Sequence, residues 1–119
     1  MEKTITLDGR TVHLRSSAGI PRLYRLKFRR DIIQDMKIIE RAMQKSKRNG
    51  KACSIPAEAL TLFENVAYLM AKHADPQGVP GTVEEWLDEF ETFSIYAVFP
   101  VIKDLWAANL ETLNTPAKK

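Results

Sequence analysis

The chain has 119 residues, of which 45% are hydrophobic and 28% charged, and this composition fits one compact domain with a modest core. No stretch approaches the roughly 18 consecutive apolar residues of a membrane-spanning helix, and the first residues lack the basic and apolar segments of a secretory signal. Cys53 is the single cysteine, which excludes an internal disulfide and a thiolate zinc cluster. We therefore expect a soluble protein of the reducing cytoplasm, with no membrane partner.

The net charge of +3 conceals two segments of opposite sign. Residues 15–51 contain 12 Lys or Arg against 3 Asp or Glu, whereas residues 52–119 contain 4 Lys or Arg against 10 Asp or Glu. Such segments can pair within one molecule, pair head to tail between copies in a homo-oligomer, or bring the basic part to an acidic partner. The sequence leaves all three arrangements open.

Residues 1–15 are predicted to form a β-hairpin, because polar and apolar side chains alternate on both sides of Asp8-Gly9. This dipeptide suits a two-residue type I′ turn, and the resulting register pairs Ile5 with Val12 on an apolar face. An isolated hairpin is only marginally stable in water. We therefore expect the apolar face to pack on the helices or on another copy.

Residues 20–48 are predicted to form a long, basic, amphipathic helix that bends near Phe28. Ser16 or Ser17 is a suitable cap, and Pro21 fits the first turn, where an N–H is not needed. Apolar residues recur at three- and four-residue spacing along one face, as expected for a helix that packs on a core. The opposite face begins with three basic side chains: Arg22, Arg25 and Arg29.

A second helix is predicted from about residues 54–56 to Ala74. Apolar residues cover most of its circumference, so it should be the helix most enclosed by its neighbours. The polar strip that remains consists of Thr61, Asn65, Tyr68 and Lys72. Turn-forming residues predict a loop over residues 75–81.

Two shorter helices are predicted in the last third of the chain. Residues 82–85 match a capping box, so a helix should begin there and continue with an aromatic side towards Phe93. A last helix is expected from Ile95, with a kink or restart at Pro100 and a weaker pattern after Asn109. The expected fold is thus mainly α, with four to five helices in a single compact domain. Residues 1–114 would form this domain, including the hairpin, and residues 115–119 a loose tail.

The sequence holds little catalytic material, with two histidines, one cysteine and no glycine-rich phosphate loop. His73 lies close to Asp75, but a histidine in the last turn of a helix is more simply explained by its interaction with the helix dipole. His73, Asp75 and Cys53 have no recognisable metal-ligand spacing. We therefore predict that the protein is not an enzyme and needs neither a metal nor a cofactor.

Two surfaces are candidates for binding. The arginines of the basic helix, beside Tyr24, could neutralise phosphates, although long basic side chains more often cover a helix and meet acidic groups of the same protein. A nucleic-acid-binding or regulatory protein that uses the basic helix of residues 20–48 is therefore the second hypothesis. The other surface is aromatic, because six rings within residues 86–106 exceed what one small core usually absorbs. These rings are Trp86, Phe90, Phe93, Tyr96, Phe99 and Trp106.

Four segments resemble the small tail assembly chaperones of siphophages and of prophages in Gram-positive bacteria. They are residues 15–25 (RSSAGIPRLYR), 63–76 (FENVAYLMAKHADP), 85–88 (EWLD) and 93–96 (FSIY). The likeness extends over nearly the whole chain, including the TPAKK ending. These strings are typical of a family and are not catalytic signatures.

The resemblance implies a protein that binds the long, helical tape measure protein, keeps it soluble and helps tail tube subunits to polymerise around it. Such a chaperone acts in the cytoplasm of the host bacterium and is absent from the mature virion. In many family members a ribosomal frameshift near the end yields a longer product, whose extra domain contacts the tail tube protein. This chain would then be the shorter product.

The binding site expected from these observations combines the two surfaces. An extended helical client would meet the aromatic side of the last two helices, and the basic face would add charge complementarity or contacts between copies. The residues predicted to bind the partner are Arg22, Tyr24, Arg25, Arg29, Trp86, Phe90, Phe93, Tyr96 and Trp106.

Overall fold

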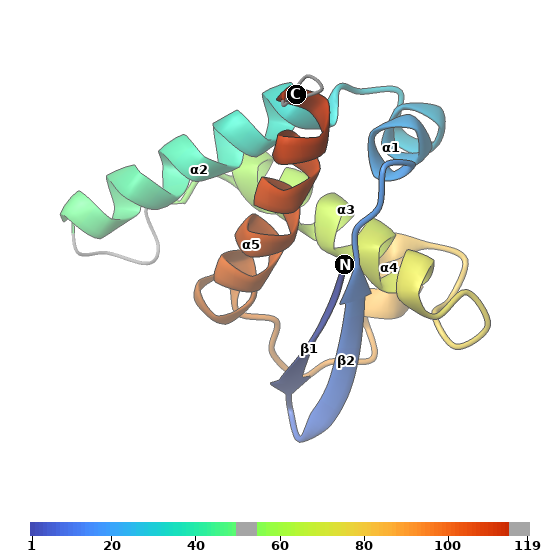
Figure 1. The fold of residues 1–119 in the computed structure, drawn as a ribbon. Coiled ribbons are helices and arrows are strands. Elements are labelled where there is room, and N and C mark those ends of the chain that lie inside the picture. Colours follow the sequence, from blue (N-terminus) through green and yellow to red (C-terminus); the bar gives the residue numbers. More distant parts are fainter. Residues whose placement is uncertain (50–54, 115–119) are drawn as a thin grey trace.

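The computed structural model describes residues 1–49 and 55–114. Across these residues a two-stranded antiparallel hairpin precedes five helices, which confirms the predicted fold class (Figure 1). The elements are β1 (Glu2–Leu7), β2 (Arg10–Arg15), α1 (Ile20–Phe28), α2 (Ile32–Asn49), α3 (Ala57–Ala74), α4 (Val83–Leu87) and α5 (Ile95–Asn114). The tail predicted at residues 115–119 lies outside the described residues.

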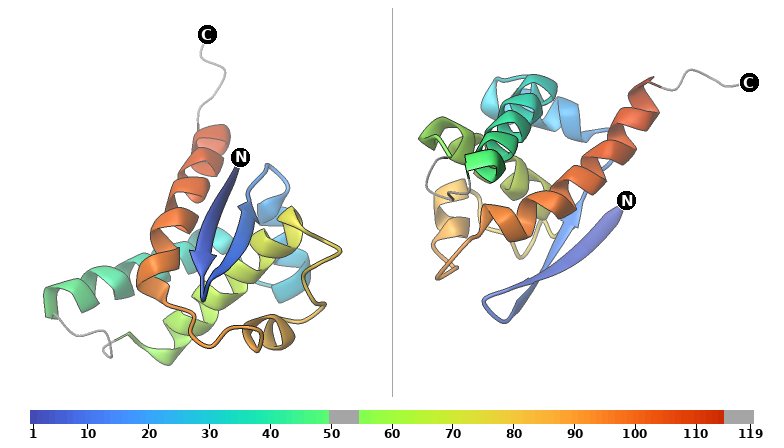
Figure 2. Two further views of the ribbon diagram at one scale, coloured as in Figure 1. Left: turned by 90° about the horizontal axis from the view of Figure 1, so that it is seen from below. Right: turned by 90° about the vertical axis from the view of Figure 1, so that its left-hand side faces the viewer.

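The hairpin has the predicted register, with Ile5 opposite Val12. Asp8 and Gly9 have φ angles of 54° and 75°, and positive φ at both central residues is what a type I′ turn requires. The inward side chains of the hairpin are buried, and β2 packs against α3 while β1 packs against α5 (Figure 2). The hairpin is therefore stabilised by the helices of its own chain, which is one of the two arrangements that we expected.

The tip of the hairpin holds the segment that follows α4. The Asp8 carboxylate accepts hydrogen bonds from the backbone N–H groups of Glu91 (2.6 Å) and Thr92 (3.2 Å). These bonds lower the pKa of Asp8, most strongly the one from Thr92. Arg10 adds an ion pair of 3.1 Å to Glu89. The turn that closes the hairpin thus also fixes the path of the chain between α4 and α5.

The basic segment is two helices, not one bent helix. Arg29 ends α1 in a left-handed conformation (φ 60°), and its N–H donates to the Arg25 carbonyl at 2.9 Å. The Asp31 carboxylate then accepts the N–H of Ile33 at 2.9 Å at the start of α2. The expected bend near Phe28 is therefore a full break. It turns the chain, so that α1 and α2 both pack against α3.

The start of α1 differs from the prediction in its cap. Gly19 occupies the N-cap position, and no side chain accepts a hydrogen bond from the first turn. The Ser17 hydroxyl lies two residues earlier and accepts the N–H of Gly19 itself at 3.3 Å. Neither Ser16 nor Ser17 is therefore the N-cap. Pro21 stands in the first turn, as predicted.

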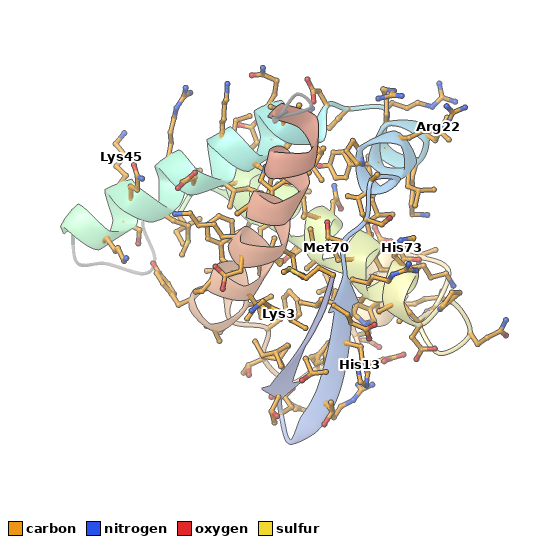
Figure 3. All side chains as sticks on the ribbon, in the orientation of Figure 1. Lys3, His13, Arg22, Lys45, Met70 and His73 are labelled. Atoms are coloured by element: carbon orange, nitrogen blue, oxygen red, sulfur yellow. The ribbon has the colours of Figure 1, made fainter. Side chains whose placement is uncertain are left out.

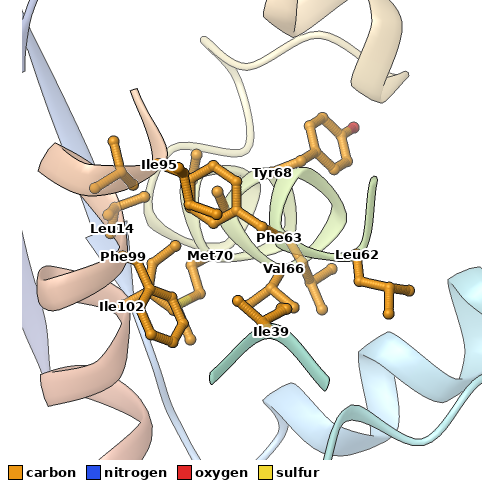
Figure 4. Packing of buried hydrophobic residues seen from close by; sticks show 14 of the residues in the cluster. Leu14, Ile39, Leu62, Phe63, Val66, Tyr68, Met70, Ile95, Phe99 and Ile102 are labelled. Atoms are coloured by element: carbon orange, nitrogen blue, oxygen red, sulfur yellow. The ribbon is translucent and has the colours of Figure 1, made fainter. Parts of the chain in front are cut away.

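Helix α3 is the centre of the fold, as its apolar circumference predicted. It contacts β2, α1, α2, α4 and α5, and nine of its side chains are buried. Figure 4 shows side chains of α3 in the space between α5 and Ile39 of α2. One member of the expected polar strip was assigned wrongly. Tyr68 is buried, because its hydroxyl donates a 2.6 Å hydrogen bond to the Pro80 carbonyl and so needs no water.

The last third of the chain begins with the predicted cap. The Thr82 hydroxyl accepts the N–H of Glu85 at 3.1 Å. The helix that it opens, however, ends at Leu87, so Phe90 and Phe93 lie in a segment without regular structure. Helix α5 neither stops nor restarts at Pro100, and it continues beyond Asn109.

Candidate protein-binding site

Most of the aromatic series lies in the core, which corrects the expectation that it supplies surplus surface. Trp86, Phe90 and Trp106 are 3%, 9% and 5% exposed, and Phe99 is also buried. Phe93 is half-buried, and Tyr96 is 38% exposed. The rings are absorbed because those of Trp86, Phe90 and Phe93 pack on one another with centroids 5.2–5.4 Å apart.

Tyr24 is also buried and belongs to a polar cluster inside the fold. Its hydroxyl donates a 2.6 Å hydrogen bond to the Asp35 carboxylate, which also receives two 2.8 Å hydrogen bonds from the Arg30 guanidinium. Burial and the adjacent carboxylate raise the pKa of Tyr24. Tyr24 therefore joins α1 to α2 and offers no surface to a partner. Sequence reasoning missed Asp35, since the spacing of Arg30 and Asp35 is not that of a helical ion pair.

Arg22, Arg25 and Arg29 are exposed, as predicted (Figure 3, where Arg22 is labelled). Among the described residues, none of the three forms an ion pair. They lie beside Leu23 and Leu26, which are 38% and 62% exposed. The acidic half of the chain therefore does not neutralise this basic face within the part of the molecule that the structure describes.

A groove lies between α2 and α5. It consists of two hollows of about 240 and 250 Å³, and both are bordered by Glu40 of α2 and Lys103 of α5. The first is also lined by Met43, Gln44, Lys47, Tyr96, Phe99 and Pro100, and the second by Ile33, Met36, Lys37, Trp106 and Ala107. Along the groove the residue numbers rise in α5 as they fall in α2, so the two helices have opposite directions.

The groove has an apolar floor and a charged rim. The floor is made of buried side chains, which are Met36, Met43, Phe99 and Trp106. Lys37, Lys47 and Lys103 stand exposed along the rim, and Lys103 forms a 2.6 Å ion pair with Glu40. At one end the Tyr96 hydroxyl is hydrogen-bonded to the Ser46 hydroxyl, which ties the two helices together.

The groove contains two of the predicted site residues, Tyr96 and Trp106, but the contribution of α2 was not foreseen. The three- and four-residue spacing of Ile32, Met36, Ile39 and Met43 indicated only that these side chains face the interior. A larger hollow of about 390 Å³ between α2 and α3 is lined by Ile38, Ala42 and Ala59 among charged residues. Arg41, Lys45 and Glu58 also line it, so its lining is more polar than that of the groove.

The histidine considered as a base does not face an acid. His73 Nε2 lies 2.9 Å from the Ser17 hydroxyl, whereas the Asp75 carboxylate accepts the N–H of Gly78. Burial, followed by the charge of Arg15, lowers the pKa of His73. These effects favour the neutral ring and oppose the helix dipole, which would favour the protonated one.

Within residues 1–49 and 55–114, no three His, Asp or Glu side chains gather in a way that could hold a metal ion. Over the same residues, no helix combines the length and apolarity needed to cross a bilayer. No protein-family model matches the sequence, and no curated protein or solved structure matches it at a significant level.

Proposed function

We propose that this protein is a tail assembly chaperone of a long-tailed phage, which binds the tape measure protein and keeps it soluble while the tail tube polymerises around it. The observation that carries the proposal is the groove between α2 and α5, with its apolar floor and lysine rim. An amphipathic helix can lay its apolar side into such a groove. A long helical client would offer many such segments.

The client surface proposed here differs from the one expected on the aromatic side of the chain. The buried rings of Trp86 and Phe90 hold the fold together, so the client would instead enter the two hollows between α2 and α5, whose lining includes the exposed Tyr96 and Ala107. Burying one large apolar side chain contributes about 1.5–3 kcal/mol, so a long client needs further contacts along the groove to offset the cost of association. The exposed lysines of the rim would keep the complex in solution.

The family resemblance of residues 15–25, 63–76, 85–88 and 93–96 supports this proposal independently of the groove. It adds that the chaperone would act in the host bacterial cytoplasm and be absent from the mature virion. A longer, frameshifted product would reach the tail tube protein. Copies of the chain could also associate, with the basic face of one near an acidic face of another.

The proposal is tested by co-expression with the tape measure protein encoded in the same phage genome. We expect the client to become soluble and to be captured with the tagged chaperone. Ala107→Arg, which projects a charged side chain into one hollow, should reduce capture. Ala97→Arg is the matched control, since Ala97 is an exposed alanine of α5 that does not line the groove. A client that stays insoluble with or without the native chain would contradict the proposal.

Nucleic-acid binding is the second candidate, and it is favoured by the unneutralised arginines on α1. Arg22, Arg25 and Arg29 have no ionic partner among the described residues, so they are available for phosphates. A gel shift with duplex DNA and RNA tests this alternative. Binding that persists at physiological salt and disappears in Arg22→Glu/Arg25→Glu would support it over the chaperone.

A further inference from the structure

We infer that the groove accepts a client helix that carries two large apolar side chains seven residues apart, with acidic residues on its flanks. This inference rests on the proposed function, which it extends by naming the chemistry of the bound segment. It commits to one occupant, an amphipathic helix of a separate protein. Its basis is the repetition of the two hollows and the charge of their rim.

The two hollows repeat at an interval of seven residues on both helices. On α2, the first is lined by residues 40, 43, 44 and 47, and the second by residues 33, 36, 37 and 40. On α5, residues 96, 99, 100 and 103 line the first, and residues 103, 106 and 107 line the second. Seven residues of helix rise about 10.5 Å, so side chains seven apart on a helix lying along the groove match this interval.

The ion pair between Lys103 and Glu40 separates the hollows. Its two side chains are 54% and 39% exposed, so they stand above the apolar floor. A bulky apolar side chain placed over the pair would desolvate both charges without compensation. The client residue midway between the two apolar ones should therefore be small or polar.

The rim of the groove is basic. Lys37 and Lys47 are exposed and form no ion pair within the described part of the chain, while Glu40 is already paired with Lys103. Two unneutralised ammonium groups thus stand on the α2 side of the groove. Acidic residues on the client flank that faces α2 would complement them, and basic residues there would be repelled.

The experiment is an NMR titration of the full chain with two synthetic 21-residue helical peptides of identical composition. The first has Phe at positions 7 and 14, alanine between them and glutamates on the flanks, while the second has Phe at positions 7 and 11. We expect the first peptide to shift amide signals of α2 and α5. The second should bind about tenfold more weakly or worse, because only one hollow is filled.

Two alanine variants supply the control on the protein side. Ala107→Arg should lower the affinity for the first peptide by about tenfold or more, and Ala97→Arg should leave that affinity unchanged. Equal affinity for both peptides, signal shifts confined to α1, or no binding at millimolar concentration would each overturn the inference. If the chain captures the tape measure protein but binds neither peptide, the inference about the groove is wrong and the proposed chaperone function stands. If it binds the first peptide but does not capture the tape measure protein, the inference about the groove stands and the proposed chaperone function is wrong.

Discussion

At the residue scale, the cluster of Tyr24, Arg30 and Asp35 is the most consequential polar feature of the fold. Asp35 of α2 is 1% exposed, and its carboxylate accepts hydrogen bonds from Tyr24 of α1 and from Arg30 in the break between the two helices. A buried carboxylate is tolerated only where its oxygens are hydrogen-bonded. The cluster therefore orients α1 relative to α2 and with it the exposed arginines of α1.

Tyr24→Phe should lower the free energy of unfolding by about 1.5–3 kcal/mol, the usual contribution of a hydrogen bond to a charged group. Asp35→Ala should cost more, because it leaves the buried Tyr24 hydroxyl without an acceptor and Arg30 without its partner. Urea denaturation measures both changes. Tyr96→Phe is the control, because Tyr96 is partly exposed and its substitution should lower the free energy of unfolding by less. A Tyr24→Phe protein as stable as the native one would show that the hydrogen bond contributes nothing.

His73 should make stability depend on pH. The pKa of His73 in the folded protein is lowered below the ordinary histidine value of 6.5, so as the pH falls the unfolded chain binds a proton at this position before the folded chain does. The contribution of His73 is therefore fully present above pH 6.5 and is lost as the pH falls through the folded pKa. Urea midpoints between pH 7.5 and 5 should decline less steeply in His73→Gln than in His13→Gln. A His73 ring that titrates at or above 6.5 by NMR would contradict this.

At the element scale, the left-handed residue between α1 and α2 yields a prediction with an internal control. Arg29→Gly should raise the free energy of unfolding by up to about 1 kcal/mol. A side chain in the left-handed conformation costs about 1–2 kcal/mol, and glycine has no side chain to cause this strain. Arg25→Gly removes the same charge from inside α1 and should instead destabilise by about 1 kcal/mol. Thermal unfolding separates the two. Destabilisation by both substitutions would mean that loss of the charge, and not the backbone conformation, determines the change in stability at Arg29.

The elements that could be predicted are those set by local chemistry. The type I′ turn that suits Asp8-Gly9 requires positive φ at two positions, and Thr82 with Glu85 has the spacing of a capping box, which is typical of a helix start. The break after Phe28 could be seen only as a bend, because a non-glycine residue at positive φ leaves no mark in the sequence. The path of the chain after α4 could not be predicted, because Asp8, which accepts the Glu91 N–H there, lies 83 residues away in the sequence.

The candidate site was harder to predict than the fold, for a related reason. Aromatic residues near the end of the chain look alike whether they face a core or a partner, and the structure buries Trp86 and Phe90. The groove exists only because α2 and α5 lie side by side, with the Lys103–Glu40 ion pair between two hollows. Neither helix alone contains that information. The arginines of α1 were predictable as exposed because their helical spacing separates them from Tyr24.

At the scale of the whole molecule, the described ion pairs do not join the basic side chains of residues 15–51 to the acidic side chains of residues 52–119. The described ion pair that joins the two segments has the reverse sense, with the lysine in the acidic half and the glutamate in the basic half. The hairpin pairs with the acidic half instead, through Lys3 with Asp104 and Arg10 with Glu89. The exposed cations of α1 and of the groove rim therefore create a positive potential that would attract an acidic partner.

This distribution predicts how salt should separate the two candidate functions. Contacts to phosphates release counterions, so any binding of duplex DNA through Arg22, Arg25 and Arg29 should fall roughly 40-fold between about 50 and 200 mM salt. Capture of a helical client in the groove should weaken far less, because apolar contacts in the two hollows are not screened by salt. Fluorescence anisotropy with labelled DNA and with the tape measure protein at both salt concentrations measures the difference. Arg22→Glu/Arg25→Glu should abolish the DNA signal and leave most of the client signal. A client signal with the same salt dependence as the DNA signal and the same loss in the double variant would favour nucleic-acid binding.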